Sequence, residues 1–167
     1  MNFIKTAIDG VIIVEPRVFK DDRGYFFESY SQKEFAANGI DCNFVQDNQS
    51  KSSFGVIRGL HCQTGSSCQA KLVRCLQGKV LDVAVELSDE NQRQLFLPRG
   101  FLHGFSVLSE TAIFAYKVDN FYDKSSEWGM RYDAPEFGID WKVPLDKVIT
   151  SEKDRIEHSL KDVPLFE

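Results

Sequence analysis

The chain has 167 residues and a mass of 19.1 kDa, the size of one domain. Its 20 lysines and arginines and 25 aspartates and glutamates leave a net charge of −5, which disfavours a nucleic-acid-binding protein. No apolar run approaches the roughly 18 residues of a membrane span, and the N-terminus has no apolar signal core. We therefore expect a soluble, cytoplasmic protein that forms a single domain over residues 1–167, with neither a membrane nor a nucleic-acid partner.

The first half of the chain reads as short strands between turn signals, with one helix. Ser31, with Glu34 three residues later, is typical of a helix N-terminus, and Gly39 is typical of a C-terminus, so residues 32–38 are predicted helical. Residues 21–24 predict a turn. Strands are predicted over residues 11–15, 25–30, 43–46, 56–61 and 71–76.

The second half continues the strand pattern. Gln77 and Gly78 predict a tight hairpin, and the apolar residues at 81, 83, 85 and 87 alternate with Asp82 and Glu86 as in one continuous strand. Strands are predicted over residues 79–87, 94–97, 101–107 and 112–118, with a short helix near 151–158. Such a series of short strands predicts an all-β antiparallel sandwich or barrel.

The histidines and cysteines form no metal-binding pattern. Residue 59 is glycine, so His61 belongs to no H-x-H pair, and His103 lies 42 residues further on without an adjacent carboxylate. The cysteines contain no C-x-x-C pair and are interpreted as small buried hydrophobic residues; they are Cys42, Cys62, Cys68 and Cys75. We therefore predict no metal and no other cofactor.

Each histidine has a structural and a functional interpretation. His61 and His103 stand in apolar strands, where each is either a half-buried side chain bonded to a backbone carbonyl or a general base. His158 lies in a charged segment and is predicted to be a solvated surface residue.

Lys71 is the cation that most needs a partner, because it shares a predicted strand face with Val73 and Cys75. An anionic ligand, such as the diphosphate of a sugar nucleotide or an enolate, would provide one. The other cations near predicted strands are equally consistent with solvated surface; they are Arg23, Arg58, Arg74, Arg99, Lys117 and Lys153.

Other polar residues also have two interpretations. Gln46, Asp47 and Asn48 form either a turn or a set of hydrogen-bonding groups for a polyhydroxylated substrate. Glu28 is a lone carboxylate in an aromatic strand, and Tyr116 fits core packing with a bonded hydroxyl.

Arg58 and His61 are three residues apart and would face opposite sides of a regular strand. If both line one pocket, the strand must break its alternation, and Gly59 is the natural place for a bulge.

Six motifs in order carry a resemblance that spans residues 4–154: they occupy residues 22–29, 44–48, 58–61, 71–74, 99–105 and 151–154. Together they closely resemble the dTDP-4-dehydrorhamnose 3,5-epimerases of the cupin class. The resemblance implies a jelly-roll fold, a homodimer, no metal, and epimerisation at C3 and C5 of a dTDP-linked 4-keto-6-deoxyhexose.

The resemblance also implies the roles of individual residues. His61 would be the base, Asp154 would hold its other ring nitrogen, Lys71 would stabilise the enolate oxygen and Tyr116 would be the acid. The nucleotide sugar would be bound by residues of which some reach across a dimer interface: Arg23, Glu28, Gln46, Asp47, Asn48, Arg58, Lys71, His103, Glu127 and Lys153.

The sequence departs from the family at two places. Phe121 stands where many relatives carry a tyrosine near the site, which predicts one weakened substrate hydrogen bond. The relatives also carry about 15 further residues, a hairpin turn and one strand, within the segment that is 81–88 here. We expect the flanking strands to be fused into one, which would reverse the direction of the chain that follows.

Two alternatives stay open beside the 3,5-epimerase, the first because it differs only in pocket detail and the second because of the fused strand. One is an epimerase that acts at a single carbon of a related dTDP-deoxysugar. The other is an inactive protein that still binds a sugar nucleotide.

Overall fold

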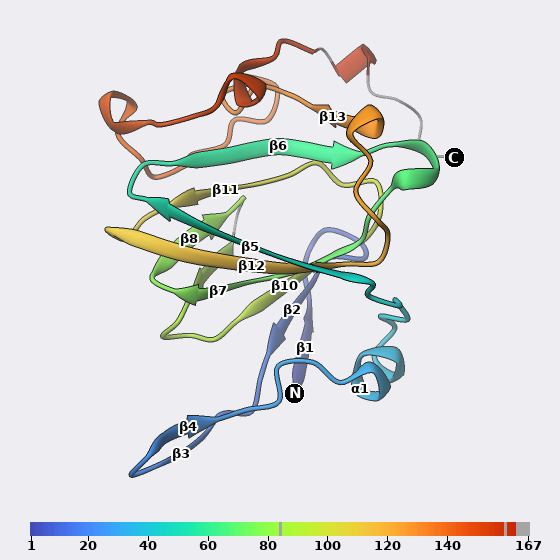
Figure 1. The fold of residues 1–167 in the computed structure, drawn as a ribbon, viewed down its shortest axis with the longest axis vertical. Helices are drawn as coiled ribbons and strands as arrows, with labels where there is room; N and C mark the ends of the chain where they lie inside the picture. The colour runs from blue at the N-terminus through green and yellow to red at the C-terminus, as the bar shows by residue number, and fades with distance from the viewer. Residues whose placement is uncertain (84, 159, 163–167) are drawn as a thin grey trace.

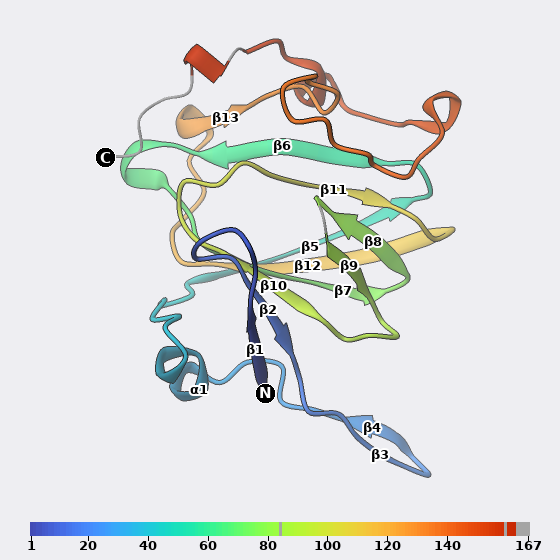
Figure 2. The same cartoon turned by 180° about the vertical axis from the view of Figure 1, so that it is seen from behind.

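The computed structural model describes residues 1–83, 85–158 and 160–162, and it consists mainly of two antiparallel β-sheets that face each other (Figure 1). One sheet has six strands in the order β1-β2-β10-β7-β12-β5, and the other has five in the order β13-β6-β11-β8-β9. Seen from behind, the same two layers enclose the middle of the molecule (Figure 2). The predicted antiparallel all-β class is confirmed.

The strands of the six-stranded sheet are β1 (Asn2–Lys5), β2 (Ile12–Glu15), β5 (Gln46–Ser53), β7 (Lys71–Gln77), β10 (Gln94–Leu97) and β12 (Thr111–Val118). Those of the five-stranded sheet are β6 (Ile57–Gln63), β8 (Lys79–Asp82), β9 (Val85–Ser88), β11 (His103–Val107) and β13 (Glu127–Gly129). Two further strands form a separate hairpin, β3 (Phe19–Asp21) and β4 (Gly24–Phe26). The helices are α1 (Gln32–Ala37) and the 3-10 turns η1 (Gly65–Ser67), η2 (Lys124–Ser126), η3 (Leu145–Lys147), η4 (Glu152–Arg155) and η5 (Leu160–Asp162).

The main core lies between the two sheets. Phe105 of β11 and Phe114 of β12 are both buried, and their rings stack with centroids 4.0 Å apart across the two layers. Val73, Val80 and Leu87 pack in the same cluster with no exposed surface. Burial of such side chains contributes roughly 1.5–3 kcal/mol each, so this cluster holds the two sheets together.

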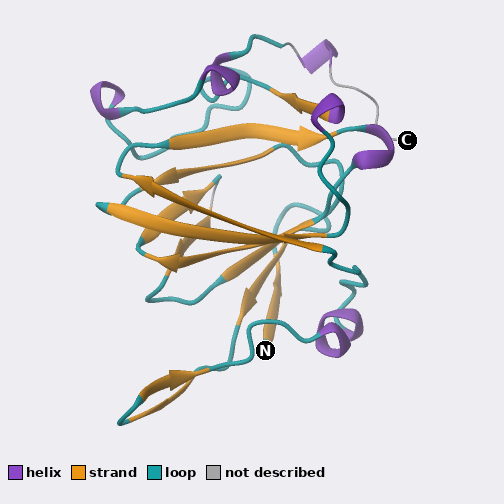
Figure 3. Cartoon of the chain, in the orientation of Figure 1, coloured by secondary structure: helices purple, strands orange, loops and turns teal. Residues whose placement is uncertain are grey.

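The β3–β4 hairpin extends from the sandwich as an arm, followed by α1 (Figure 3). The predicted turn is confirmed, because Asp21 pairs with Gly24. The strand predicted over residues 25–30 ends at Phe26, because the chain pairs only with β3 and then leaves the arm. Helix α1 forms with Gly39 in the predicted left-handed conformation at φ 86°, but the Ser31 side chain makes no capping hydrogen bond.

Two predictions around β8 are wrong. The segment 79–87 is not one strand but the antiparallel hairpin β8–β9, in which Asp82 pairs with Val85; Ala84 lies outside the described residues. Val83 begins the tight connection with a φ of 49°, which reverses the chain and ends the alternation of faces. Because both arms of a hairpin remain, the chain keeps the direction that an antiparallel sheet needs.

The second wrong prediction is the hairpin at Gln77 and Gly78. Strand β7 belongs to the six-stranded sheet and β8 to the five-stranded sheet, so Gly78 carries the chain from one layer to the other. Its φ is 77°, and a Cβ there would lie 2.2 Å from the Thr111 carbonyl oxygen. A glycine at this crossing was predictable, but not the change of sheet.

The described chain from β13 onward lies over β6 (Figure 1, orange to red). The helix predicted near 151–158 is shorter, η4, and carries the buried Asp154. Within residues 1–83, 85–158 and 160–162, no helix is long and apolar enough to cross a membrane.

Candidate active site

A bulge in β6 places two polar side chains on one side of the sheet. His103 pairs with His61, and Phe105 pairs with Arg58, so β6 has one more residue than β11 between these pairs. Gly59 provides the bulge with a φ of 132°, and a Cβ there would lie 2.5 Å from Gly104 Cα. Arg58 and His61 consequently line the same cavity of about 640 Å³, within the range of small-molecule sites. The predicted bulge is confirmed.

His61 and Asp154 form a pair on this cavity. His61 Nε2 lies 3.0 Å from Asp154 Oδ1, although the two groups are not aligned as in an ideal hydrogen bond. A proton on Nε2 faces the carboxylate in this arrangement, which leaves Nδ1 as the ring nitrogen with a free lone pair.

Asp154 is held as a buried carboxylate. Burial raises the pKa of this carboxyl, but the neighbouring His61 ring and hydrogen bonds from the Ser151 hydroxyl and the Gly59 and Ser151 amides together outweigh it and hold the pKa well below its usual range. Ser151 donates to Oδ2 from its amide at 2.8 Å and from its hydroxyl at 2.6 Å, while the Gly59 amide donates to Oδ1 at 3.0 Å. The carboxylate is therefore ionised and fixed beside His61.

Lys71 of β7 lines the same cavity from the opposite sheet. Burial lowers the pKa of its ammonium, while Cys62, Asp82 and Glu127 act in the opposite direction. A partly desolvated cation inside a cavity interacts strongly with an anionic oxygen, so Lys71 suits an enolate or another anion formed there.

Tyr116 of β12 also reaches the cavity. Burial raises the pKa of its phenol, whereas Lys153 and Arg58 lower it. The hydroxyl is therefore protonated at neutral pH and available as a proton donor, with two cations near enough to stabilise the phenolate that donation would leave.

A network of charged and polar groups lies at one side of the cavity. Lys153 bonds to Glu127 Oε1 at 2.7 Å, and the Tyr122 hydroxyl donates to Oε2 at 3.2 Å. Burial raises the Glu127 pKa, but the hydrogen bond and charge of Lys153 and the bond from Tyr122 together outweigh it, so the pKa is lowered and the group is anionic. Phe121 is 66% exposed and does not line the cavity, whereas the neighbouring Tyr122 does.

A second histidine–carboxylate pair lies next to the first. His103 Nε2 is 2.8 Å from Asp82 Oδ2, and both residues are buried. Since His103 is the cross-strand partner of His61, the two pairs are neighbours on adjacent strands. Asp82 is also one of the charges that favour the protonated form of Lys71.

The cavity brings together most of the residues predicted for the site: His61, Lys71, Tyr116, Asp154, Asn48, Arg58, His103, Glu127 and Lys153. Gln46 lies next to it, since its side-chain amide donates to Asn48 Oδ1 at 2.9 Å. Asp47 does not line this cavity. Because side chains alternate along β5, it faces the other side of the strand, where it pairs with Lys117 at 2.7 Å.

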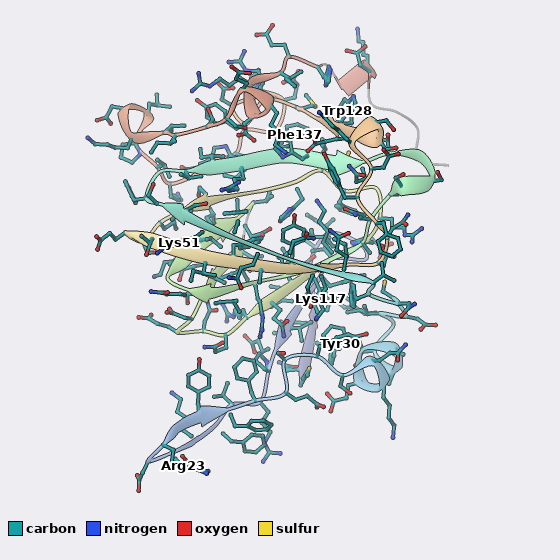
Figure 4. All side chains as sticks on the ribbon, viewed as in Figure 1. Arg23, Tyr30, Lys51, Lys117, Trp128 and Phe137 are labelled. Carbon is teal, nitrogen blue, oxygen red and sulfur yellow. The ribbon has the colours of Figure 1, made fainter. Side chains whose placement is uncertain are left out.

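Arg23 and Glu28 are not near the cavity of their own chain. Arg23 lies at the end of the β3–β4 arm, where its exposed side chain pairs with Asp21 (Figure 4). Glu28 is exposed on the segment that follows the arm.

Sequence reasoning missed three residues of the site. Asp82 follows the apolar residues Val80 and Leu81 at the end of β8, and strand alternation predicts only that it lies on the face opposite Leu81. Tyr122 lines the cavity and directly follows Phe121, the position at which the sequence departs from the family. Ser151 opens the motif 151–154, and its capping-box geometry with Asp154 could have been proposed from the spacing.

Two facing antiparallel sheets around a polar cavity, with a histidine–carboxylate pair, a lysine and a tyrosine converging in it, define a cupin-like β sandwich with an acid–base site. The chain belongs to the dTDP-4-dehydrorhamnose 3,5-epimerase family, whose model matches residues 5–88 and 83–162. These enzymes are isomerases, and the predicted family is confirmed.

Individual relatives agree in sequence and fold. The dTDP-4-dehydrorhamnose 3,5-epimerase of Shigella flexneri is 48% identical over 182 aligned positions that cover 99% of each protein. The enzyme of that name from Elizabethkingia anophelis has a crystal structure that superimposes with a TM-score of 0.90 at 48% identity, covering 97% of each chain. The dTDP-6-deoxy-D-glucose-3,5-epimerase of Legionella pneumophila, in complex with dTDP-4-keto-L-rhamnose, has a TM-score of 0.87 at 43% identity, covering 92% of this chain and 89% of its own.

The comparisons locate the shortened segment. The two stretches that match the family overlap at residues 83–88, which contain the end of the β8–β9 hairpin. The Shigella alignment is longer than the 167 residues of this chain, so it contains gaps in this chain. The fold nevertheless superimposes on the Elizabethkingia anophelis structure over nearly its whole length.

Proposed function

We propose that this protein epimerises dTDP-4-dehydro-6-deoxy-D-glucose at C3 and C5 to dTDP-4-dehydro-L-rhamnose, with no metal or other cofactor. The observation that carries the proposal is the convergence of His61, Asp154, Lys71 and Tyr116 on one cavity from both sheets. The shortened β8–β9 hairpin leaves this group together, which favours an active enzyme over an inactive binding protein.

The first half of the reaction is a proton abstraction. The 4-ketone acidifies the hydrogens on C3 and C5, because the electron pair of either C–H bond can move into an enolate. His61 Nδ1 takes the proton, the C–H bond breaks, and the negative charge develops on the oxygen at C4. Asp154 stabilises the imidazolium that forms, as a buried carboxylate 3.0 Å away.

The second half returns a proton to the opposite face. Lys71 stabilises the enolate oxygen electrostatically until the carbon is protonated. The Tyr116 hydroxyl donates that proton, the new C–H bond inverts the centre, and the phenolate left behind lies near Arg58 and Lys153. His61 then loses its proton and Tyr116 regains one through solvent, so the enzyme is restored.

The nucleotide is held by the remaining polar groups of the cavity. Arg58 and Lys153 supply positive charge for the diphosphate, and Asn48, His103 and Glu127 supply hydrogen-bonding groups. The complex of the Legionella pneumophila relative with dTDP-4-keto-L-rhamnose supports this substrate class.

The working unit in this proposal is a homodimer. The arm exposes Phe19, Tyr25 and Phe26, with exposed fractions of 50%, 59% and 71%. Exposed apolar side chains on a projecting arm are typical of an interface. A second copy that receives the arm would also receive Arg23 at its end. The free cysteines fit the reducing cytoplasm.

The test is deuterium exchange in D₂O with dTDP-4-keto-6-deoxyglucose, followed by NMR, for the wild type and His61→Asn. We expect exchange at both C3 and C5 in the wild type and a loss of at least about 10²-fold in the variant, the usual contribution of a general base. Binding of dTDP, measured by calorimetry, should stay within a few-fold in His61→Asn.

Exchange at only one carbon would identify a single-site epimerase instead. Folded wild-type protein that binds dTDP but exchanges neither hydrogen would contradict the enzymatic proposal.

A further inference from the structure

Strand β13 is short and stands at the edge of its sheet, yet it touches the proposed base. It has three residues and pairs with β6 alone, with Gly129 opposite His61. Edge strands have one unpaired side, so the position of β13 depends on what covers that side.

The backbone of β13 forms a wall against the His61 ring. A Cβ on Gly129 would lie 2.8 Å from His61 Cδ2 and 2.6 Å from the Leu60 carbonyl oxygen. Only a glycine fits this approach, and the imidazole has no room to move towards the strand. A displacement of β13 would therefore change the space in which His61 sits.

The C-terminal segment 154–158 covers the free side of β13 and of the residues after it. The Tyr132 amide donates to the Asp154 carbonyl at 3.0 Å. Arg131 also pairs with Glu157 at 2.6 Å, but this ion pair is solvent-exposed and contributes little to the packing. His158 Nδ1 donates to the Gly129 carbonyl at 2.7 Å. The prediction that His158 is a solvated surface residue is wrong, because this bond and its neighbours leave it half-buried.

His158 also stacks on the strand it binds. Its ring lies 5.2 Å from the Trp128 ring at an interplanar angle of 13°, and Trp128 stands on β13 above β6 (Figure 4). A stacked aromatic pair contributes about 0.5–1.5 kcal/mol beyond its buried area. One side chain thus holds two successive residues of β13.

We propose that His158 is a positioning residue for His61. A single segment then positions two adjacent atoms of the imidazole, Nε2 through Asp154 and Cδ2 through His158 and Gly129. His158 does not line the cavity, so it acts through these groups and not on the substrate. The inference rests on the proposed function, in which His61 is the base.

The test separates the two contacts of His158. His158→Phe keeps a ring on Trp128 but loses the donor, and His158→Asn keeps an N–H near the place of Nδ1 but loses the ring. Glu157→Gln is the matched control, because Glu157 is 78% exposed and lies in the same segment. We expect kcat to fall at least about tenfold in His158→Phe, by analogy with the loss of an outer hydrogen-bond partner of a metal-ligating histidine. KM and dTDP affinity should stay within about twofold.

His158→Asn should recover most of kcat, and Glu157→Gln should match the wild type. Unchanged kcat in His158→Phe overturns the inference. So does a parallel loss of kcat, dTDP affinity and thermal midpoint, which marks a purely structural residue.

A second measurement does not need turnover. The imidazole NMR signals of His61 in the dTDP complex should shift in His158→Phe and not in Glu157→Gln. Unshifted signals overturn the inference even if the wild type proves inactive, whereas an inactive wild type with shifted signals removes only the proposed function.

Discussion

One substitution can separate the charge of the Asp154 side chain from its shape. Asp154→Asn keeps the shape of the side chain but removes the charge that faces His61 Nε2. We expect kcat to fall on the order of 10²-fold or more, since the carboxylate fixes the tautomer and stabilises the imidazolium. Steady-state kinetics checks this, and dTDP affinity within a few-fold of wild type is the control for an intact cavity.

The same carboxylate predicts a pH-dependent stability. Its folded pKa lies below the unfolded value of about 3.9, so its contribution is fully present above about pH 4 and is lost as pH falls towards the folded pKa. Urea unfolding should show wild type more stable than Asp154→Asn at pH 7, with a smaller difference at pH 3. An equal difference at both pH values would contradict a stabilising charge.

Substitution of Tyr116 should separate hydrogen exchange with solvent from inversion of the sugar carbon. In Tyr116→Phe the base is intact, so His61 can still remove a proton, exchange it with solvent and return it to the same face. We expect deuterium to enter the substrate while the yield of inverted product falls by on the order of 10²-fold. NMR of the recovered sugar measures both quantities. Loss of exchange together with inversion would mean that Tyr116 is needed before the enolate forms.

At the scale of elements, the bulge in β6 should be intolerant of side chains. A Cβ on Gly59 meets Gly104 Cα at 2.5 Å and the His103 carbonyl oxygen at 2.7 Å, at a φ of 132°. We expect Gly59→Ala to destabilise the fold by roughly 2–4 kcal/mol, measured by denaturant unfolding. Gly24 has a φ of 127° with nothing within 4 Å, so Gly24→Ala carries the backbone cost alone. Equal losses in both variants would refute the crowding argument.

The alternating apolar residues of the sequence predicted the strands that pack in the core. Strand β10 lies over residues 94–97 as predicted, and β7 and β12 within one residue at either end. Strand β5 was missed beyond Gln46 because its eight residues are polar; their inward side chains line the cavity and its surroundings rather than the core. Polar strands lack the apolar signal from which strands are predicted.

Most of the predicted site residues line one cavity, but the geometry of that cavity was only partly predictable. The bulge at Gly59 followed from the spacing of Arg58 and His61, because alternation is a local property. The β8–β9 turn did not, since Val83 at φ 49° breaks the usual preference of β-branched residues. The pair of His103 with Asp82 joins two strands that are distant in sequence, which no local pattern reveals.

At the scale of the whole molecule, the arm separates two predicted substrate-binding residues from the cavity of their own chain. Arg23 lies at its end and Glu28 follows it. In a homodimer with exchanged arms, each cavity would combine the base of one chain with Arg23 of the other. Such a dimer makes a prediction that a monomer does not make, because substitutions in two different chains can then affect the same cavity.

Heterodimers of Arg23→Ala and His61→Asn test this arrangement. The two chains are co-expressed with different tags and purified on both, so every dimer contains one of each. If Arg23 acts in the partner's cavity, one site carries both lesions and the other carries neither. We then expect about half of the wild-type activity, although each variant homodimer is nearly inactive. If Arg23 acts in its own chain, each site carries one lesion and activity stays low. Full activity of the Arg23→Ala homodimer, or a monomer in sedimentation, would equally rule out the shared site.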